Sequence, residues 1–174
     1  MKSKHWWMAG AGLVTLVVVG KASGLLSLSK EIEIQTNAQV YKVNLTGFEL
    51  WVYVTIKNPT SSQVSISFPF VKIIYQQQVL ENGVKKIKEN TLTSSQIVDK
   101  TVLIKANKEI KLPEPIKLKV NWLTLGMNVP SALKEYRANG RVNLLVRTRS
   151  EVLSLKKEII QEQVTTIGNG EEKA

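Results

Sequence analysis

Residues 48–57 alternate between apolar side chains and side chains that are polar or, at Trp51 and Tyr53, aromatic with a polar group, and this alternation constrains the fold more than any other feature of the sequence. Successive side chains of a β-strand point to opposite faces, so the pattern predicts a strand with one face in a hydrophobic core. The inward positions are Phe48, Leu50, Val52, Val54 and Ile56. Trp51 and Tyr53 lie on the opposite face, where we expect a partner or another segment to contact them.

The strand runs directly into Asn58-Pro59. Proline restricts the residue before it and has no N–H for a ladder, so the pair predicts a turn over residues 57–62. A hairpin turn is predicted at residues 81–83, where Gly83 can adopt positive φ. Polar residues 88–96 are expected to form a loop. Further alternating segments predict strands at residues 64–68, 71–75, 101–105, 116–122, 142–149 and near 159–160.

One short helix is predicted over residues 128–139, beginning near Pro130 and ending before Gly140. About seven short strands with this single helix predict an all-β fold, an antiparallel immunoglobulin-like or fibronectin-like β-sandwich. We assign residues 31–166 to this domain. Residues 167–174 are rich in Gly and Glu and are expected to be a flexible C-terminal tail.

Residues 1–30 have a different character. Residues 6–20 carry no charge, and after Lys21 apolar residues continue to Leu28. Counted through Leu28, the segment is long enough to cross a hydrocarbon core of about 30 Å as a helix. It predicts a single transmembrane helix that acts as a signal anchor, with membrane lipid as its partner. The residues that we expect to hold this anchor are Trp6, Trp7, Leu13, Leu16, Val18 and Lys21.

The basic start of the chain orients this anchor. Lys2, Lys4 and His5 precede the apolar run, so the positive-inside rule places the N-terminus in the cytoplasm and the domain on the non-cytoplasmic side of the membrane. A cleaved signal peptide is the alternative, because small residues at positions 22–24 suit a cleavage site.

The composition leaves little material for catalysis. Cysteine is absent, His5 is the only histidine, and Asp99 is the only aspartate. No spacing resembles a nucleophile–base pair, a phosphate-binding glycine loop or a set of metal ligands. We therefore expect no enzyme activity, no catalytic residues, no cofactor, no metal and no small-molecule substrate.

The net charge of the chain is +10. Outside the N-terminal segment, cations and anions are mixed, and this balance argues against a nucleic-acid partner. The basic strand with Arg141, Arg147 and Arg149 is a candidate surface for anionic lipid or phosphate groups. The other interpretation is a surface strand that its cations keep soluble.

Residues 43–164 resemble the water-stress, or late-embryogenesis-abundant group 2, domain. The resemblance rests on the strand that ends in Asn58-Pro59, the following Val64-Ser65-Ile66, and the helix-to-strand passage over residues 136–142 that contains Gly140. It implies an immunoglobulin-like sandwich without catalytic residues, often tethered by one N-terminal helix and associated with desiccation protection or a position close to lipid. The chain departs from that pattern at residues 76–78 and 85–95.

These features together predict a membrane-anchored, non-catalytic structural or binding module. We expect it to contact a partner protein, another copy of itself, lipid or an envelope component. One alternative is a virion membrane protein that packs against shell proteins, with Trp51 and Tyr53 in that contact. Another is a secreted or periplasmic stress-protection domain, released when the N-terminal segment is cleaved.

Overall fold

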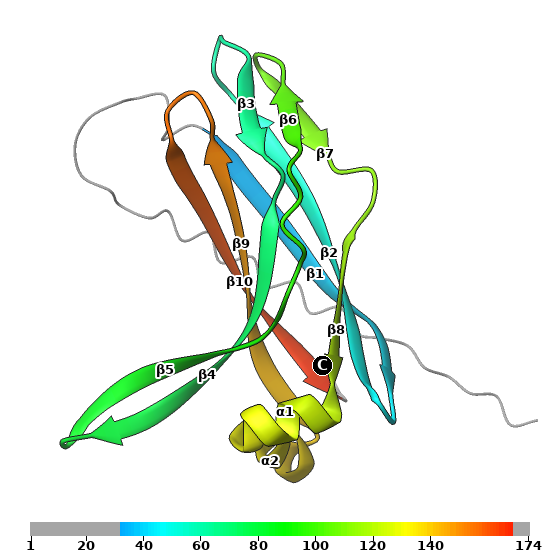
Figure 1. Cartoon of the computed structure of the whole chain (residues 1–174), viewed down its shortest axis with the longest axis vertical. Helices are drawn as coiled ribbons and strands as arrows, with labels where there is room; N and C mark the ends of the chain where they lie inside the picture. Colours follow the sequence, from blue (N-terminus) through cyan, green and yellow to red (C-terminus); the bar gives the residue numbers. More distant parts are fainter. Residues whose placement is uncertain (1–31, 169–174) are drawn as a thin grey trace, which may run out of the picture.

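The computed structural model describes residues 32–168, so the predicted transmembrane helix lies outside the described residues. The described part is mainly strand, arranged as two antiparallel sheets with two helices at one end (Figure 1). This confirms the prediction of an all-β antiparallel sandwich.

The first sheet is built around β2 (Gly47–Asn58), which is paired along both of its edges. One edge pairs with β1 (Glu33–Asn44). The other edge pairs with two shorter strands in succession, β8 (Ile116–Asn121) and then β7 (Lys108–Lys111). Because β2 has no free edge, its position is fixed by hydrogen bonds on both sides.

The second sheet is built around β9 (Arg141–Val152). One edge of β9 pairs with β10 (Lys157–Gly168), and the other pairs with β4 (Phe70–Glu81) and with β3 (Val64–Ser67). The outer strands are β5 (Val84–Ser94), on β4, and β6 (Thr101–Ile104), on β3. The two sheets meet where Ala38 N donates to Gln163 Oε1 at 3.0 Å.

The core lies between the sheets and has the composition that the alternating pattern predicts. Leu50, Val52, Val54 and Ile56 of β2 are completely buried, and Phe48 is nearly so. They belong to one apolar cluster with inward residues of the second sheet, including Val71, Ile73, Leu144 and Val146. The burial of these apolar side chains is the main favourable contribution to folding.

Two helices are present where one was predicted. Helix α2 (Pro130–Asn139) agrees with the prediction, and Gly140 ends it with φ of 67°. Helix α1 (Trp122–Asn128) occupies residues that the sequence assigned partly to a strand. Its start is fixed by the side chain of Asn121, which accepts a hydrogen bond from Leu123 N.

The predicted loop over residues 88–96 is wrong, because β5 pairs with β4 as far as Ser94. The hairpin turn itself is confirmed, with positive φ at Asn82 and Gly83. Figure 1 shows the outer part of this hairpin projecting away from the sandwich. We call residues 76–90 the β4–β5 arm. This part of the strand was not predicted because its side chains are mostly charged. Both faces of the arm are exposed to solvent, so its residues need not alternate between apolar and polar.

The side chain of Asn58 gives the Asn58-Pro59 pair a structural role. The side chain is buried at the end of β2, and its Oδ1 accepts hydrogen bonds from the N–H and the hydroxyl of Thr60. Its Nδ2 donates to the carbonyls of Ser62, Ile104 and Lys105 at 2.8–3.2 Å. Asn58 therefore joins the end of β2 in one sheet to the end of β6 in the other.

Replacing Asn58 by alanine should lower the free energy of unfolding by about 3 kcal/mol, because several buried polar groups lose their partner. Urea unfolding followed by circular dichroism measures this change. Asn139→Ala is the matched control, since Asn139 is exposed at the end of α2 and its loss should cost less than about 0.5 kcal/mol. Equal stability of the two variants would contradict the structural role of Asn58.

Candidate functional site

The outer face of the first sheet carries a cluster of aromatic rings and lysines. Tyr41 of β1 stacks on Trp51 of β2, with ring centroids 3.7 Å apart and planes 10° apart. Lys117 Nζ lies 5.2 Å from the centroid of Trp51, and Lys111 Nζ lies 5.7 Å from that of Tyr53. We call Tyr41, Trp51, Tyr53, Lys111 and Lys117 the aromatic–lysine face.

Strand pairing brings these side chains together. Trp51 lies directly opposite Lys117 of β8, and residues opposite each other in a ladder share a face. Tyr41 has no direct partner, because the register of β1 shifts between Val40 and Lys42. Such a bulge redirects a side chain, and here the ring of Tyr41 lies against Trp51. Glu49 Oε1 accepts a hydrogen bond of 2.7 Å from the indole N–H of Trp51 and fixes that ring further.

The aromatic–lysine face is positively charged. Two neighbouring lysines have carboxylate partners: Lys119 lies 3.8 Å from Glu49 and Lys57 lies 3.9 Å from Glu109. Within residues 32–168, no carboxylate pairs with Lys111 or Lys117. Lysines that lie above aromatic rings and have no carboxylate partner among the described residues suit contact with an acidic or interfacial partner.

The sequence predicted two members of this face, Trp51 and Tyr53, and did not identify the others. Tyr41 was missed because none of the predicted strands includes it, whereas β1 continues to Asn44. Lys117 was predicted only to lie on a strand, within residues 116–122. Only the pairing of β8 with β2 places it above Trp51.

The structure does not bring Arg141, Arg147 and Arg149 together as an unpaired basic stripe. The guanidinium of Arg147 donates two hydrogen bonds of 2.9 Å to Glu89 of β5 and one to Glu162 of β10. Arg149 pairs with Glu158 at 3.2 Å. Arg141 is exposed at the opposite end of β9 from Arg149.

Hydrogen bonds to Glu89 raise the pKa of Arg147, and the guanidinium in turn lowers the pKa of Glu89 below its usual value. Arg147 therefore serves to hold β5, β9 and β10 together. Contact of these arginines with anionic groups outside the chain stays a prediction.

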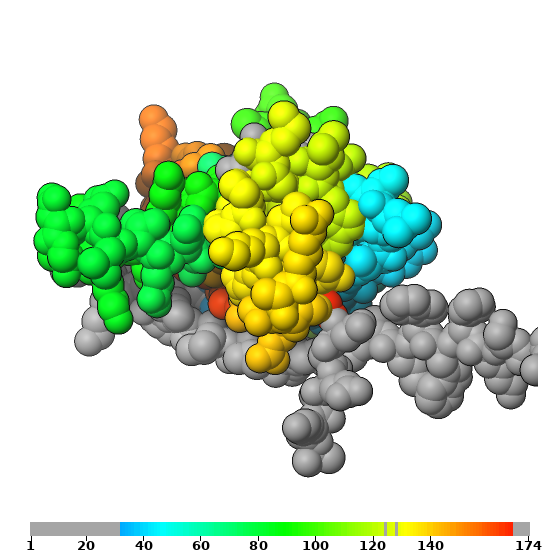
Figure 2. Space-filling model, turned by 90° about the horizontal axis from the view of Figure 1, so that it is seen from below, coloured from blue at the N-terminus to red at the C-terminus, as the bar shows by residue number. Residues whose placement is uncertain are grey.

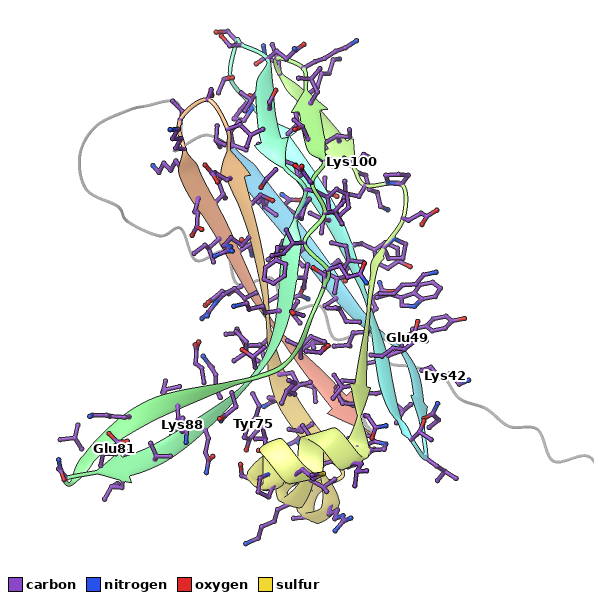
Figure 3. All side chains as sticks on the ribbon, in the orientation of Figure 1. Lys42, Glu49, Tyr75, Glu81, Lys88 and Lys100 are labelled. Atoms are coloured by element: carbon purple, nitrogen blue, oxygen red, sulfur yellow. The ribbon has the colours of Figure 1, made fainter. Side chains whose placement is uncertain are left out.

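A half-open cavity of about 440 Å³ lies where β6 and β7 face each other at the edges of the two sheets. Its walls are mainly apolar and include Phe68, Val102, Ile110 and Leu112, with Lys100 and Glu114 as its charged residues. In Figure 3, Lys100, which lines this cavity, lies near β6. Lys42 on β1 and Glu49 on β2 lie well apart from it. In the part of the chain that the structure describes, no three acidic or histidine side chains are arranged to hold a metal ion.

Of the two helices found between residues 32 and 168, neither has the length and apolar character that a membrane crossing requires. The residues predicted to hold the anchor, from Trp6 to Lys21, lie outside the described residues.

One solved structure with a TM-score above 0.5 supports the fold. The chain is similar to Spo0M, a sporulation control protein from Bacillus subtilis, with a TM-score of 0.51 and 14% identity, over 79% of this chain and 49% of Spo0M. It therefore spans about half the length of that protein. A protein from Archaeoglobus fulgidus aligns over 80% of this chain and 98% of its own, with 14% identity and a TM-score of 0.44. No family model matches the sequence. No curated protein matches it either.

Replacing Arg147 by glutamine should lower the free energy of unfolding by about 1 kcal/mol at neutral pH, a modest loss because solvent partly screens the ion pairs. Since the folded-state pKa of Glu89 is lowered, this stabilisation is present at neutral pH and lost as the pH falls through that pKa. Urea unfolding of both proteins at neutral and acidic pH measures it. Arg141→Gln is the control, and an Arg147→Gln deficit that persists in acid would contradict this origin.

Proposed function

We propose that this protein is a single-pass, membrane-anchored binding module that performs no chemical step. In this proposal residues 1–30 are the anchor, and the sandwich lies on the non-cytoplasmic side of the membrane. The sequence of the N-terminal segment supports it, with lysines before the apolar run and two tryptophans at its start. An immunoglobulin-like sandwich of the water-stress type is the finer description of the fold that we propose.

The observation that carries the proposal is the aromatic–lysine face. Tyr41 is 57% exposed, although its ring is stacked on Trp51. Large rings that are held rigidly at a surface lose little conformational freedom when a partner covers them. Tyr and Trp are for this reason enriched among the residues that dominate binding energy.

The positive charge of the aromatic–lysine face favours a partner that carries acidic groups. Lys111 and Lys117 are each held near a ring by cation–π contacts, and both keep ammonium groups at the surface. Truncating aromatic residues at the centre of an interface weakens binding strongly, whereas removing charges at its rim mainly affects the rate of association. We infer that the partner is a protein or envelope component with acidic groups around an apolar centre.

Site-specific photo-cross-linking tests this proposal. A benzophenone amino acid placed at Tyr41 in the full-length protein should give adducts of defined mass when membranes of the producing cells are irradiated. Leu103 on β6 is the matched control position, because it is similarly exposed, at 52%, but lies in the other sheet. Lys117→Glu in the Tyr41 background should lower the adduct yield about fivefold or more.

Adducts of equal yield from Tyr41 and Leu103 would contradict a partner site on the aromatic–lysine face. An absence of adducts at Tyr41 would do the same. Because Tyr41 and Lys117 are both surface residues, thermal unfolding of each variant should remain close to that of the parent protein.

A further inference from the structure

Three elements that are distant in sequence lie at the same end of the molecule. Figure 1 shows the β1–β2 turn, the two helices and the tip of the β4–β5 arm all toward the lower end, opposite the point where β1 begins, with the arm tip and the turn on opposite sides of the helices. Figure 2 looks onto this end, with the helices between the arm and the β1–β2 hairpin. We call it the distal end: residues 44–47, helix α1 and residues 80–87.

The β1–β2 turn exposes a leucine on a rigid frame. The side chain of Leu45 is 100% exposed. Asn44 Oδ1 accepts hydrogen bonds of 2.8–2.9 Å from Thr46 N, Thr46 Oγ1 and Gly47 N, so the polar groups of the turn are satisfied locally. Nothing within the described residues covers Leu45, and the geometry of the turn holds it at the apex.

Helix α1 extends this apolar surface. Its first residue is tied to the turn, since Trp122 N donates to Thr46 O at 3.0 Å and Trp122 Nε1 donates to Asn44 O at 2.8 Å. Leu123, the next residue, is 72% exposed, and Met127 lies one helical turn further on and is equally exposed. Residues four apart share a helix face, so Leu123 and Met127 lie on the same side of α1.

The β4–β5 arm presents the third set of apolar residues, all largely exposed. The strand register places Leu80 and Ile87 on one face of the arm and Val84 on the other. Two contacts fix the base of the arm against α2: Tyr75 OH donates to Glu135 Oε2 at 2.8 Å, and Ser131 Oγ donates to Gln77 Oε1 at 3.1 Å. Figure 3 shows Tyr75 beside the helices, with Glu81 and Lys88 further out along the arm.

The charge around these apolar groups is positive. Lys85 and Lys88 on the arm, and Lys42 next to the β1–β2 turn, have no carboxylate partner within residues 32–168. Of the acidic groups nearby, Glu81 pairs with Lys86 at 2.9 Å, Glu89 pairs with Arg147, and Glu135 accepts a hydrogen bond from the hydroxyl of Tyr75. Exposed aliphatic side chains are therefore combined with uncompensated ammonium groups.

The shape of this surface favours lipid over protein. A protein interface needs closely matched surfaces, whereas the distal end consists of separate projections: a turn apex, a short helix and a hairpin tip. Lipid headgroups rearrange around such projections, aliphatic side chains enter the boundary of the acyl chains, and lysines meet anionic headgroups. Strand addition to the free edge of β5 is disfavoured by Lys85, Lys86 and Lys88 along it.

We propose that the distal end docks onto an anionic lipid bilayer. β1 contains 12 residues, which places the distal end about 40 Å from the start of the domain. If the proposed anchor holds the chain there, the bilayer that the distal end reaches is a second one, and this part of the inference rests on the proposed function. The protein would then bridge two membranes.

The full-length chain in neutral phosphatidylcholine nanodiscs tests the inference, because the N-terminal segment is then already occupied by lipid. Added vesicles with one third phosphatidylserine should carry these discs into the pellet, whereas pure phosphatidylcholine vesicles should not. The double variant Leu45→Ser/Leu123→Ser should weaken vesicle binding about tenfold or more. Lys85→Gln/Lys88→Gln should weaken it by a similar factor, as should raised salt.

Ile97→Ser is the matched control, because Ile97 is an aliphatic residue that is 83% exposed but lies outside the distal end. It should leave vesicle binding unchanged, and all these variants should unfold at the parent temperature. The inference is overturned if the parent protein ignores anionic vesicles, or if the leucine variant binds as the parent does. The first result would favour a protein partner for the distal end.

Incorporation into the discs is read separately, from co-elution of the chain with disc lipid. A chain that does not incorporate would contradict the proposed anchor. The same variants, assayed without discs, would then still decide whether Leu45 and Leu123 contribute to vesicle binding.

Discussion

The rest of the structure depends on the position of the central strand β2, which is paired along both edges and whose two faces differ in composition. Its inner face supplies completely buried aliphatic side chains to the core. Its outer face carries Trp51 and Tyr53 into the aromatic–lysine face. Since one strand provides both, a shift of its register by one residue would turn the core residues outward and the charged ones inward.

Rigid support is common to both proposed surfaces. Trp51 is held between strand pairing, the ring of Tyr41 and the carboxylate of Glu49. At the distal end, hydrogen bonds join the β1–β2 turn to α1. Binding then requires little additional ordering of the protein, which reduces the entropic cost of association. The same logic explains Arg147, which pairs with a residue of the β4–β5 arm and fixes its strand to β9 and β10.

Local patterns in the sequence predicted much of the fold. The alternation of β2, the turn after Asn58, the positive φ at Gly83 and the end of α2 at Gly140 all depend on neighbouring residues, and the structure confirms them. Helix α1 was missed because residues 116–122 were predicted as one strand, whereas Asn121 is the cap at which the helix begins. Residues 88–94 of β5 were predicted as a loop because an arm that is exposed on both faces needs no apolar alternation.

The candidate surfaces were harder to predict, since they depend on pairing between distant residues. The bulge that places Tyr41 over Trp51 leaves no signal in β1 itself. The three arginines were grouped by their spacing along one strand, but Glu89 and Glu162, which neutralise Arg147, come from two other strands. Spacing along a chain predicts which face a residue occupies and does not reveal its partners across a sheet.

Membrane attachment through residues 1–30 is the central claim, and the intact mass of the protein in carbonate-washed membranes tests it most directly. We predict the full 19.5 kDa chain in the membrane pellet after alkaline extraction. A freely soluble chain that begins after Ala22 or Gly24 would contradict the claim and would indicate a secreted or periplasmic domain.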